Sequence, residues 1–121
     1  MNTPKKILII DDEEGIRESL KLILNDHFDL ILTDSPDGGY EILKSQSDIG
    51  LVMLDIKMPQ INGLEFLPTI KREFHDIPVI MVTGYKSVDT ASEAADRGAD
   101  GYIVKPFDSK DILKAVKKYI K

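Results

Sequence analysis

The chain has 121 residues, no cysteine, and 16 basic against 21 acidic residues, for a formal net charge of −5. This length predicts one domain over residues 1–121, and the lack of cysteine excludes disulfide frameworks, thiolate zinc sites and cysteine nucleophiles. The acidic balance does not indicate direct nucleic-acid binding. No apolar run approaches the roughly 20 residues that cross a bilayer, and the N-terminal run is too short for a secretory signal, so we expect a cytoplasmic protein with no membrane contact.

The first half of the chain alternates short apolar runs with segments of helical periodicity. Residues 7–10 predict a first strand, and apolar side chains recur at helical spacing between residues 16 and 24. Residues 28–33 predict a second strand. A weak helix is expected at 37–44, because its two adjacent glycines each cost a helix about 1 kcal/mol.

The middle of the chain holds two continuous apolar runs, at residues 51–54 and 79–82. Such runs are typical of strands that are covered on both faces of a sheet. A third helix is expected between them, with Asn62 as its N-cap. Pro68 lies inside this segment and is expected to kink the helix or to delay its start.

A fourth helix is predicted at residues 87–97 and is expected to stop at Gly98. Its inward-facing side chains are predicted to be small, namely Val88, Ala91, Ala94 and Ala95. Because small side chains bury little apolar area, we expect this helix to be weakly held.

The last unit consists of a strand at residues 102–104 and a helix that Asp108 caps. Five strand–helix units with short connections predict an α/β fold, a doubly wound parallel sheet with helices on both faces.

Charged or hydroxyl-bearing residues stand at the ends of four of the predicted strands: Asp11 and Asp12, Asp55, Thr83, and Lys105. In an open parallel sheet, ligands bind beyond the carboxyl ends of the strands. We therefore expect three carboxylates, a hydroxyl and an ammonium group to converge on one rim of the sheet.

This set of groups suits phosphoryl transfer assisted by a metal ion. Three crowded carboxylates repel one another unless a cation compensates their charge, and hard oxygen ligands of this kind suit Mg²⁺. An ammonium group and a hydroxyl opposite the metal would neutralise the oxygens of a phosphoryl group, and a carboxylate between them can attack phosphorus. Each residue alone also has an ordinary structural interpretation. Asp11 and Asp12 could be loop acids or a helix cap, Asp55 and Thr83 turn residues, and Lys105 a solvated lysine.

Four segments together carry a resemblance to a known family. They are Ile-Asp-Asp-Glu at 10–13, Leu-Asp-Ile-Lys-Met-Pro at 54–59 with Gly63, Val-Thr-Gly at 82–84, and Gly-Tyr-Ile-Val-Lys-Pro-Phe at 101–107. In this order and spacing, the chain resembles the receiver domains of response regulators over its whole length. The resemblance implies a flavodoxin-like sheet with strand order 2-1-3-4-5.

The resemblance also implies a phosphoacceptor and its cofactor, Mg²⁺. Asp55 would be the phosphorylated residue. Asp12 and Asp55 would bind Mg²⁺ directly, together with the main-chain carbonyl of Lys57, and Asp11 would act mainly through metal-bound water. A domain of this kind is a signalling phosphoacceptor, which catalyses only its own phosphorylation and slow dephosphorylation.

Three further residues would respond to the phosphoryl group. Thr83 and Lys105 would contact its oxygens, and Tyr102 corresponds to the switch aromatic that swings inward when Thr83 moves. The Lys105–Pro106 peptide bond is expected to be cis. Lys57 and Tyr85 flank the expected path of the hydrolytic water and are predicted to slow loss of the phosphoryl group.

The partners that the resemblance implies are proteins of a signalling pathway. The donor would be a histidine kinase, a histidine phosphotransfer protein or a small acyl phosphate. Protein donors are expected to contact the first helix and the loops of the site, at Gly15, Ile16 and Pro106. A downstream protein or effector domain would respond through the face made by the fourth helix, fifth strand and fifth helix. The segment Gly15-Ile16-Arg17 is closer to the sporulation phosphorelay type than to the chemotaxis type.

Three rival functions remain open from the sequence. A phosphatase of the haloacid dehalogenase type also forms an aspartyl phosphate, but it needs a second acid at the position of Lys57. A flavodoxin-like FMN-binding module needs a phosphate-binding loop after the first strand, where residues 11–14 are all acidic. A degenerate receiver that binds partners without phosphorylation is disfavoured because all the site positions are intact.

Overall fold

Five strands alternate with five helices in the part of the chain that the computed structural model describes, residues 5–121. The strands are β1 (Lys6–Ile10), β2 (Asp29–Thr33), β3 (Ile49–Leu54), β4 (Val79–Thr83) and β5 (Gly101–Val104). The helices are α1 (Glu14–Leu24), α2 (Pro36–Ser45), α3 (Gly63–Glu73), α4 (Val88–Asp96) and α5 (Ser109–Tyr119). Each predicted strand and helix is present, with small shifts at the ends. None of the helices in the described residues is long and apolar enough to span a bilayer.

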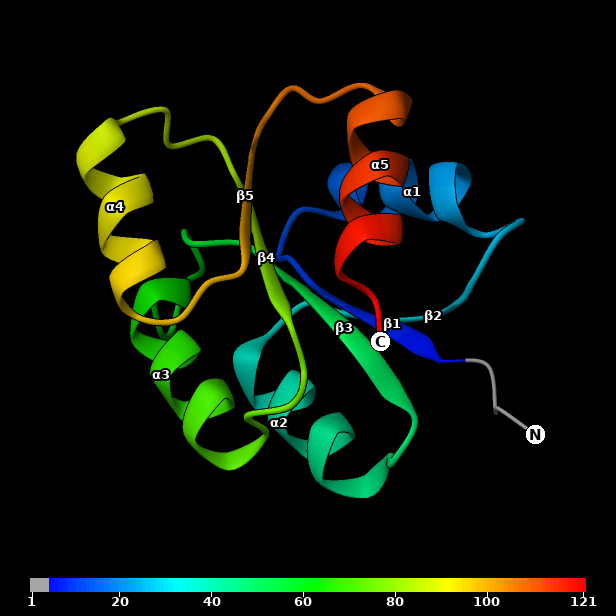
Figure 1. The fold of residues 1–121 in the computed structure, drawn as a ribbon, viewed down its shortest axis with the longest axis horizontal. Helices are drawn as coiled ribbons and strands as arrows, with labels where there is room; N and C mark the ends of the chain where they lie inside the picture. Colours follow the sequence, from blue (N-terminus) through cyan, green and yellow to red (C-terminus); the bar gives the residue numbers. More distant parts are fainter. Residues whose placement is uncertain (1–4) are drawn as a thin grey trace.

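The strands form one parallel sheet in the order β2-β1-β3-β4-β5 (Figure 1). This arrangement confirms the predicted fold class, a doubly wound flavodoxin-like sheet. The central strand β3 is buried along its whole length, as its unbroken apolar sequence requires. Strand order reverses between β1 and β3, and such a reversal places a ligand-binding crevice at the carboxyl ends of these two strands.

Helices cover both faces of the sheet, with α1 and α5 on one face and α2, α3 and α4 on the other (Figure 1). Successive side chains of a strand point to opposite faces. Ile7 and Ile9 of β1 accordingly belong to the core under α1 and α5, while Leu8 and Ile10 belong to the core on the opposite face. The two cores fix the strand ends in space, and the strand ends carry the candidate site.

Side-chain caps set the starts of two helices that the sequence predicted. The Asn62 side chain accepts a hydrogen bond from the Leu64 N–H at 2.7 Å, and Asp108 accepts one from the Asp111 N–H at 2.9 Å. These bonds satisfy N–H groups that the first turn of a helix leaves without partners. Gly98, just beyond α4, has a φ of +107°, a left-handed conformation that favours glycine.

The helix α2 is longer than expected despite its two glycines. A Cβ atom at Gly39 would lie 2.4 Å from the Cδ1 atom of Ile10, and one at Gly38 would lie 2.4 Å from the Thr33 hydroxyl. The glycines therefore let α2 pack directly against β1 and β2, and this close packing offsets their low helix propensity.

Pro68 does not delay the start of α3, so that one of its two expected effects is wrong, whereas a kink at Pro68 stays a prediction. The helix begins at Gly63, directly after its cap, and continues through Pro68 to Glu73. The proline removes one N–H, which would have bonded the carbonyl of Leu64. Instead, Arg97 Nη1 donates a hydrogen bond to that carbonyl at 2.8 Å.

The inward face of α4 is smaller than the sequence predicted. Ala94 is fully buried and Ala91 is half-buried, but Ala95 is exposed and Val88 is 82% exposed. The prediction that Val88 and Ala95 point inward is wrong. Val88 and Ala95 do lie at helical spacing from Ala91 and Ala94, but the buried face of α4 is too narrow to include them.

Candidate functional site

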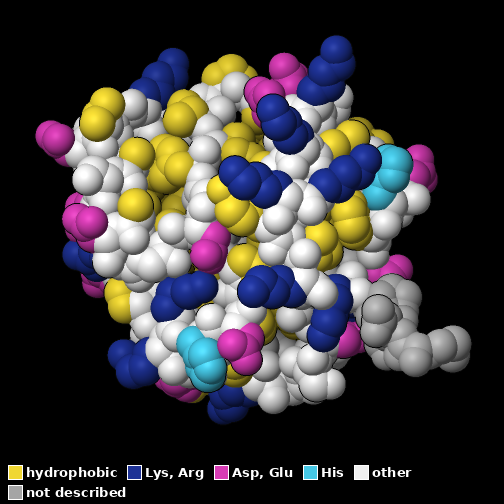
Figure 2. Space-filling view, viewed as in Figure 1, with side chains coloured by type: hydrophobic (Ala, Val, Ile, Leu, Met, Phe, Trp, Pro, Cys, Tyr) yellow, Lys and Arg dark blue, Asp and Glu magenta, His cyan; other side chains and the backbone are white. Residues whose placement is uncertain are grey.

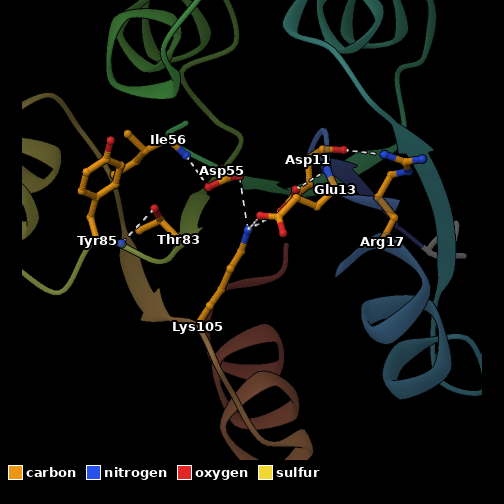
Figure 3. Close-up of polar contacts among 8 residues, drawn as sticks. All are labelled: Asp11, Glu13, Arg17, Asp55, Ile56, Thr83, Tyr85 and Lys105. Atoms are coloured by element: carbon orange, nitrogen blue, oxygen red, sulfur yellow. Dashed lines mark hydrogen bonds and ion pairs between the residues drawn. The ribbon is translucent and has the colours of Figure 1, made fainter. Parts of the chain in front are cut away.

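The carboxyl ends of four strands bring the predicted residues to one rim. Asp11 follows β1, Asp55 follows β3, Thr83 ends β4 and Lys105 follows β5, and their side chains face one another (Figure 3). A cleft of about 670 Å³ opens at this rim. The residues that line it are Asp12, Glu13, Asp55, Lys57, Met58, Pro59, Thr83, Gly84, Tyr85 and Lys105.

Four carboxylates form a tight cluster at this rim. One oxygen from each of Asp11, Asp12, Glu13 and Asp55 lies within 4.8 Å of the others. Asp11 and Asp55 are buried, at 2% and 3% exposure, whereas Asp12 and Glu13 are exposed. The cluster therefore has a buried floor and an open side that faces solvent.

Main-chain donors hold one oxygen of each buried carboxylate. The Glu13 N–H donates to Asp11 Oδ1 at 2.9 Å, and the Ile56 N–H donates to Asp55 Oδ1 at 2.8 Å. The guanidinium of Arg17 donates to the main-chain carbonyl of Asp11 at 2.8 Å and ties α1 to the loop that carries the acids (Figure 3). The sequence reasoning did not assign Arg17 this contact.

The ammonium of Lys105 is shared among three acids. Its Nζ lies 3.0 Å from Asp11 Oδ2, 3.1 Å from Glu13 Oε1 and 3.2 Å from Asp55 Oδ2 (Figure 3). Sequence reasoning placed Lys105 beside the phosphoacceptor but missed the contact with Glu13. The run of four acids at 11–14 was the available signal, because a loop this dense in negative charge favours a nearby cation.

Burial has the largest effect on the ionisation of the acids in the site. Burial raises the pKa of Asp11 from 3.8 to about 6, although the bond from the Glu13 N–H opposes the rise. Burial also raises the pKa of Asp55, opposed by the charge of Lys105. Burial alone would lower the pKa of Lys105, but its close contact with Asp11 and the contacts and charges of Glu13 and Asp55 raise it overall.

The donor set fits a small divalent cation. Asp11 Oδ2 is a buried oxygen with no well-aligned hydrogen-bond donor among the described residues, although it lies within ion-pair distance of Lys105. Carboxylate oxygens on an open-sided cleft, with room for several waters, are the ligands that Mg²⁺ prefers. Asp12 provides an exposed oxygen at the mouth of the cleft. Lys57 also lines the cleft, and the role of its main-chain carbonyl stays a prediction.

Thr83 connects the site to the loop before α4 and to β5. Its side chain is buried, and its hydroxyl accepts a hydrogen bond from the Tyr85 N–H at 3.3 Å. The hydroxyl of Tyr102, which is half-buried, donates to the main-chain carbonyl of Tyr85 at 2.8 Å. Tyr102 therefore contacts the loop that Thr83 also contacts, and its inward swing stays a prediction.

Two tight backbone features support the site. A Cβ atom at Gly63 would lie 2.0 Å from the main-chain oxygen of Asp55, so only glycine allows α3 to begin this close to the phosphoacceptor candidate. The peptide bond between Lys105 and Pro106 is cis. Near the same rim, Gly15 is exposed and Ile16 is half-buried on α1.

Comparisons with known proteins agree with this geometry. The model of the response regulator receiver domain family matches residues 7–117. Sporulation initiation phosphotransferase F of Bacillus subtilis is 38% identical over 96% of this chain and 94% of its own length. The response regulator protein FleR of Pseudomonas aeruginosa is 33% identical over 94% of this chain, which spans only 24% of FleR. The crystal structure of a response regulator receiver domain protein from Clostridium thermocellum superposes with a TM-score of 0.89 at 33% identity, over 96% of this chain and 94% of that one.

The family match covers the strands and helices from β1 into α5, including every strand end that forms the cleft. The resemblance seen in the four sequence segments is confirmed. This chain belongs to the receiver domains of two-component response regulators.

Proposed function

We propose that this chain accepts a phosphoryl group on Asp55 with the help of Mg²⁺ and passes the signal to another protein. The observation that supports this most is the position of the Asp55 carboxylate. One of its oxygens faces the ammonium of Lys105 at 3.2 Å, and the side chain lines an acidic cleft that is open to solvent on its other side. An incoming phosphoryl group would meet Asp55 between an ammonium group and a cation site.

The metal would be held by Asp12, Asp55 and the main-chain carbonyl of Lys57, with Asp11 behind them. A bound Mg²⁺ supplies positive charge that offsets the negative charge of the phosphoryl oxygens in the transition state. Asp11 is held in place by the Glu13 N–H at one oxygen, so its other oxygen stays directed at the Lys105 ammonium, 3.0 Å away.

The transfer itself is a displacement at phosphorus. A carboxylate oxygen of Asp55 attacks, the P–N bond to a donor phosphohistidine breaks, and its electron pair passes to the imidazole nitrogen. With a small acyl phosphate as donor, a P–O bond breaks in the same way. Lys105 and the Thr83 hydroxyl would bind the phosphoryl oxygens, which requires Lys105 to exchange part of its present contact with Asp55 for contact with the phosphoryl group.

Partner binding would change through α4, β5 and α5. If the Thr83 side chain moves to donate to a phosphoryl oxygen, the Tyr85 N–H that now donates to its hydroxyl must follow or lose that bond, and the Tyr102 hydroxyl is bonded to the same loop residue. Figure 2 shows hydrophobic side chains over α4 and β5, next to a group of Lys and Arg side chains over α5. This face suits a partner that offers apolar and acidic groups.

The donor would approach the open side of the cleft. We infer that a histidine kinase or histidine phosphotransfer protein contacts α1 and the loops of the rim, at Gly15, Ile16 and Pro106. Gly15 and Pro106 are both exposed, and a Cβ atom at Gly15 would meet nothing within 4 Å. A downstream protein or an effector domain would receive the signal on the other face described above.

The lifetime of the aspartyl phosphate would depend on Lys57 and Tyr85. Both residues line the cleft and both are exposed, Tyr85 at 43%. Hydrolysis needs a water in line with phosphorus, opposite the leaving carboxylate. Side chains that lie over this approach would exclude the water and prolong the phosphorylated state.

Intact-protein mass spectrometry tests the proposal. Incubation with acetyl phosphate and Mg²⁺ should add about 80 Da, one phosphoryl group. Chelation of Mg²⁺ should abolish the gain. A mass that stays unchanged with Mg²⁺ present, under conditions in which the protein is folded, would favour the rival in which the domain binds partners without phosphorylation.

A further inference from the structure

The carbonyl of Leu64 is an acceptor that α3 itself leaves open. In an α-helix the N–H of residue 68 bonds the carbonyl of residue 64, and Pro68 has no N–H. A carbonyl left without a donor in a partly buried setting costs free energy, so a donor from elsewhere stabilises this turn. The first turn of α3 therefore has a free acceptor built into it.

Arg97, directly after α4, supplies the donor. Its Nη1 atom lies 2.8 Å from the Leu64 carbonyl oxygen, and its Nη2 atom lies 2.8 Å from Glu93 Oε2, one turn back along α4. The ion pair with Glu93 orients the guanidinium, so that its other edge faces α3. Hydrogen bonds from a charged donor contribute more than neutral ones.

The same end of α4 makes a second close contact with α3. A Cβ atom at Gly98 would lie 2.9 Å from the Lys71 side chain. The Lys71 ammonium donates to the Ile77 carbonyl and to Asp100 Oδ2, both at 3.1 Å, and Asp100 also accepts from the Val79 N–H at 2.8 Å. The C-terminal end of α4 and the loop after it are thus held by polar contacts.

The opposite end of α4 is held less: among the described residues, the side-chain hydrogen bonds between its approach and other elements are those of Tyr85 with Thr83 and Tyr102. Residues 84–89 are all exposed, and Val88 is 82% exposed. The N-cap bonds from Ser87 are local to α4 itself. Since Ala94 is the only fully buried apolar side chain that α4 contributes within the described residues, its apolar packing provides little restraint.

The turn that Arg97 contacts also supports the phosphoacceptor. Leu64 follows Gly63, whose N–H donates to the Ile56 carbonyl at 2.7 Å and whose α-carbon packs on the main chain of Asp55. The hydrogen bond from Arg97 to Leu64 therefore connects the end of α4 to the main chain beside Asp55, through the adjacent residues Leu64 and Gly63.

We propose that Arg97 is a positioning residue, which uses the carbonyl freed by Pro68 to fix the C-terminal end of α4 on the turn beside Asp55. With this end fixed, α4 pivots about Arg97, and rearrangement on phosphorylation is confined to its N-terminal end and the loop at 84–87. The fixed end of α4 in the unphosphorylated domain is inferred only from the contacts described above. Its role in signalling rests on the proposed phosphorylation of Asp55.

Amide hydrogen exchange on the full chain, without phosphoryl donor, tests the pivot. Arg97→Gln should speed exchange of the α4 amides about tenfold, the effect of losing roughly one charged hydrogen bond. In a Pro68→Ala background the restored N–H bonds Leu64, so Arg97→Gln should then have less than a twofold effect. Arg72→Gln, a change of the same kind at an exposed arginine on α3, should leave α4 unchanged. Equal acceleration by Arg97→Gln in both backgrounds, or none in either, would overturn the assignment.

A second exchange experiment, with acetyl phosphate and Mg²⁺, tests the part in signalling. In the wild-type protein, faster or slower exchange on phosphorylation should be confined to residues 84–90, and in Arg97→Gln it should extend along the whole of α4. Mass gain verified in the same samples separates the two proposals. If the mass rises and both proteins change over the same residues, the pivot has no role in the switch. If the mass does not rise, the proposed phosphorylation is wrong. The exchange experiment without phosphoryl donor still tests whether Arg97 holds the end of α4 on Leu64.

Discussion

Lys105 Nζ, at the end of β5, lies 3.0 Å from Asp11 Oδ2, at the end of β1 on the far side of the central strand. The Asp11 side chain is only 2% exposed. The same ammonium also forms ion pairs with Glu13 and Asp55, so one positive charge lies beside three carboxylates of a cluster of four. This excess of negative charge in the metal-free site leads to the first prediction, and the burial of Asp11 leads to the second.

Mg²⁺ should stabilise the domain, and Asp12 should be needed for the effect. Binding to the folded state alone raises the melting temperature by mass action. Asp12→Ala relieves repulsion in the metal-free site, so it should raise the melting temperature without Mg²⁺ and remove the response to Mg²⁺. Differential scanning calorimetry with and without the ion measures both effects. Destabilisation of the metal-free variant by more than about 1 kcal/mol would show that Asp12 has a structural role instead.

The metal-free domain should lose stability as the pH rises toward neutrality. Burial raises the pKa of Asp11 in the folded state to about 6, above its ordinary 3.8. A group with a raised carboxyl pKa contributes stability that is complete below about pH 3.8 and is lost as pH rises through about 6. Asp55 shifts in the same direction.

Urea denaturation of the wild type and Asp11→Asn between pH 4 and pH 7.5 measures this effect. The gap between the two should change across that range by up to about 3 kcal/mol, in favour of the variant at high pH. Saturating Mg²⁺ should reduce the loss in the wild type. A constant gap across the range would mean that the Asp11 carboxyl is ionised throughout.

Gly63→Ala should destabilise the domain strongly. The added Cβ atom would lie 2.0 Å from the Asp55 main-chain oxygen, and neither atom can move away unless the backbone that carries it shifts. A loss of roughly 3 kcal/mol or more is expected from this kind of clash. Gly15→Ala is the matched control, because its Cβ atom meets nothing within 4 Å and alanine favours the helix, so it should stabilise by up to about 1 kcal/mol. Equal effects at the two glycines would contradict the close approach of α3 to Asp55.

The aspartyl phosphate should decay faster when the cleft is opened. Lys57→Asn and Tyr85→Ala each remove side-chain bulk beside the expected path of water, and both should shorten the half-life of the phosphorylated protein several-fold. The fraction of protein that still carries the added phosphoryl mass, followed over time after removal of the donor, gives the rate. Lys86→Ala, an exposed neighbour outside the cleft lining, should decay at the wild-type rate. Unchanged decay in both cleft variants would leave the lifetime to an external phosphatase or a relay partner.

The fold and the rim of the cleft follow from patterns that act over short stretches of sequence. Unbroken apolar runs predict buried parallel strands, and the residue after each run is then placed at one edge of the sheet. Asp11, Asp55, Thr83 and Lys105 could be brought together in this way without any knowledge of their contacts. Asn62 and Asp108 were likewise predicted as caps from local rules.

Contacts that depend on the reach of long side chains between elements were not predictable. Arg97 bonds a carbonyl 33 positions earlier, and Lys105 meets Glu13 across 92 positions. The outward direction of Val88 depends on how α4 is rotated against the sheet, and two or three small side chains do not fix that rotation. Pro68 was expected to kink α3 or to delay its start, and the hydrogen bond that Arg97 donates to the freed carbonyl could not be predicted because Arg97 lies beyond the end of α4.

The identity of the phosphorylated residue is the most direct test of the account. The protein, treated with acetyl phosphate and Mg²⁺, is reduced with borohydride, which converts an aspartyl phosphate to homoserine, and the peptides are sequenced by mass spectrometry. The account predicts that Asp55 alone is converted and that Asp55→Asn gives no converted residue while remaining folded and responsive to pH. Conversion at Asp11 or Asp12 in the wild-type protein would contradict it.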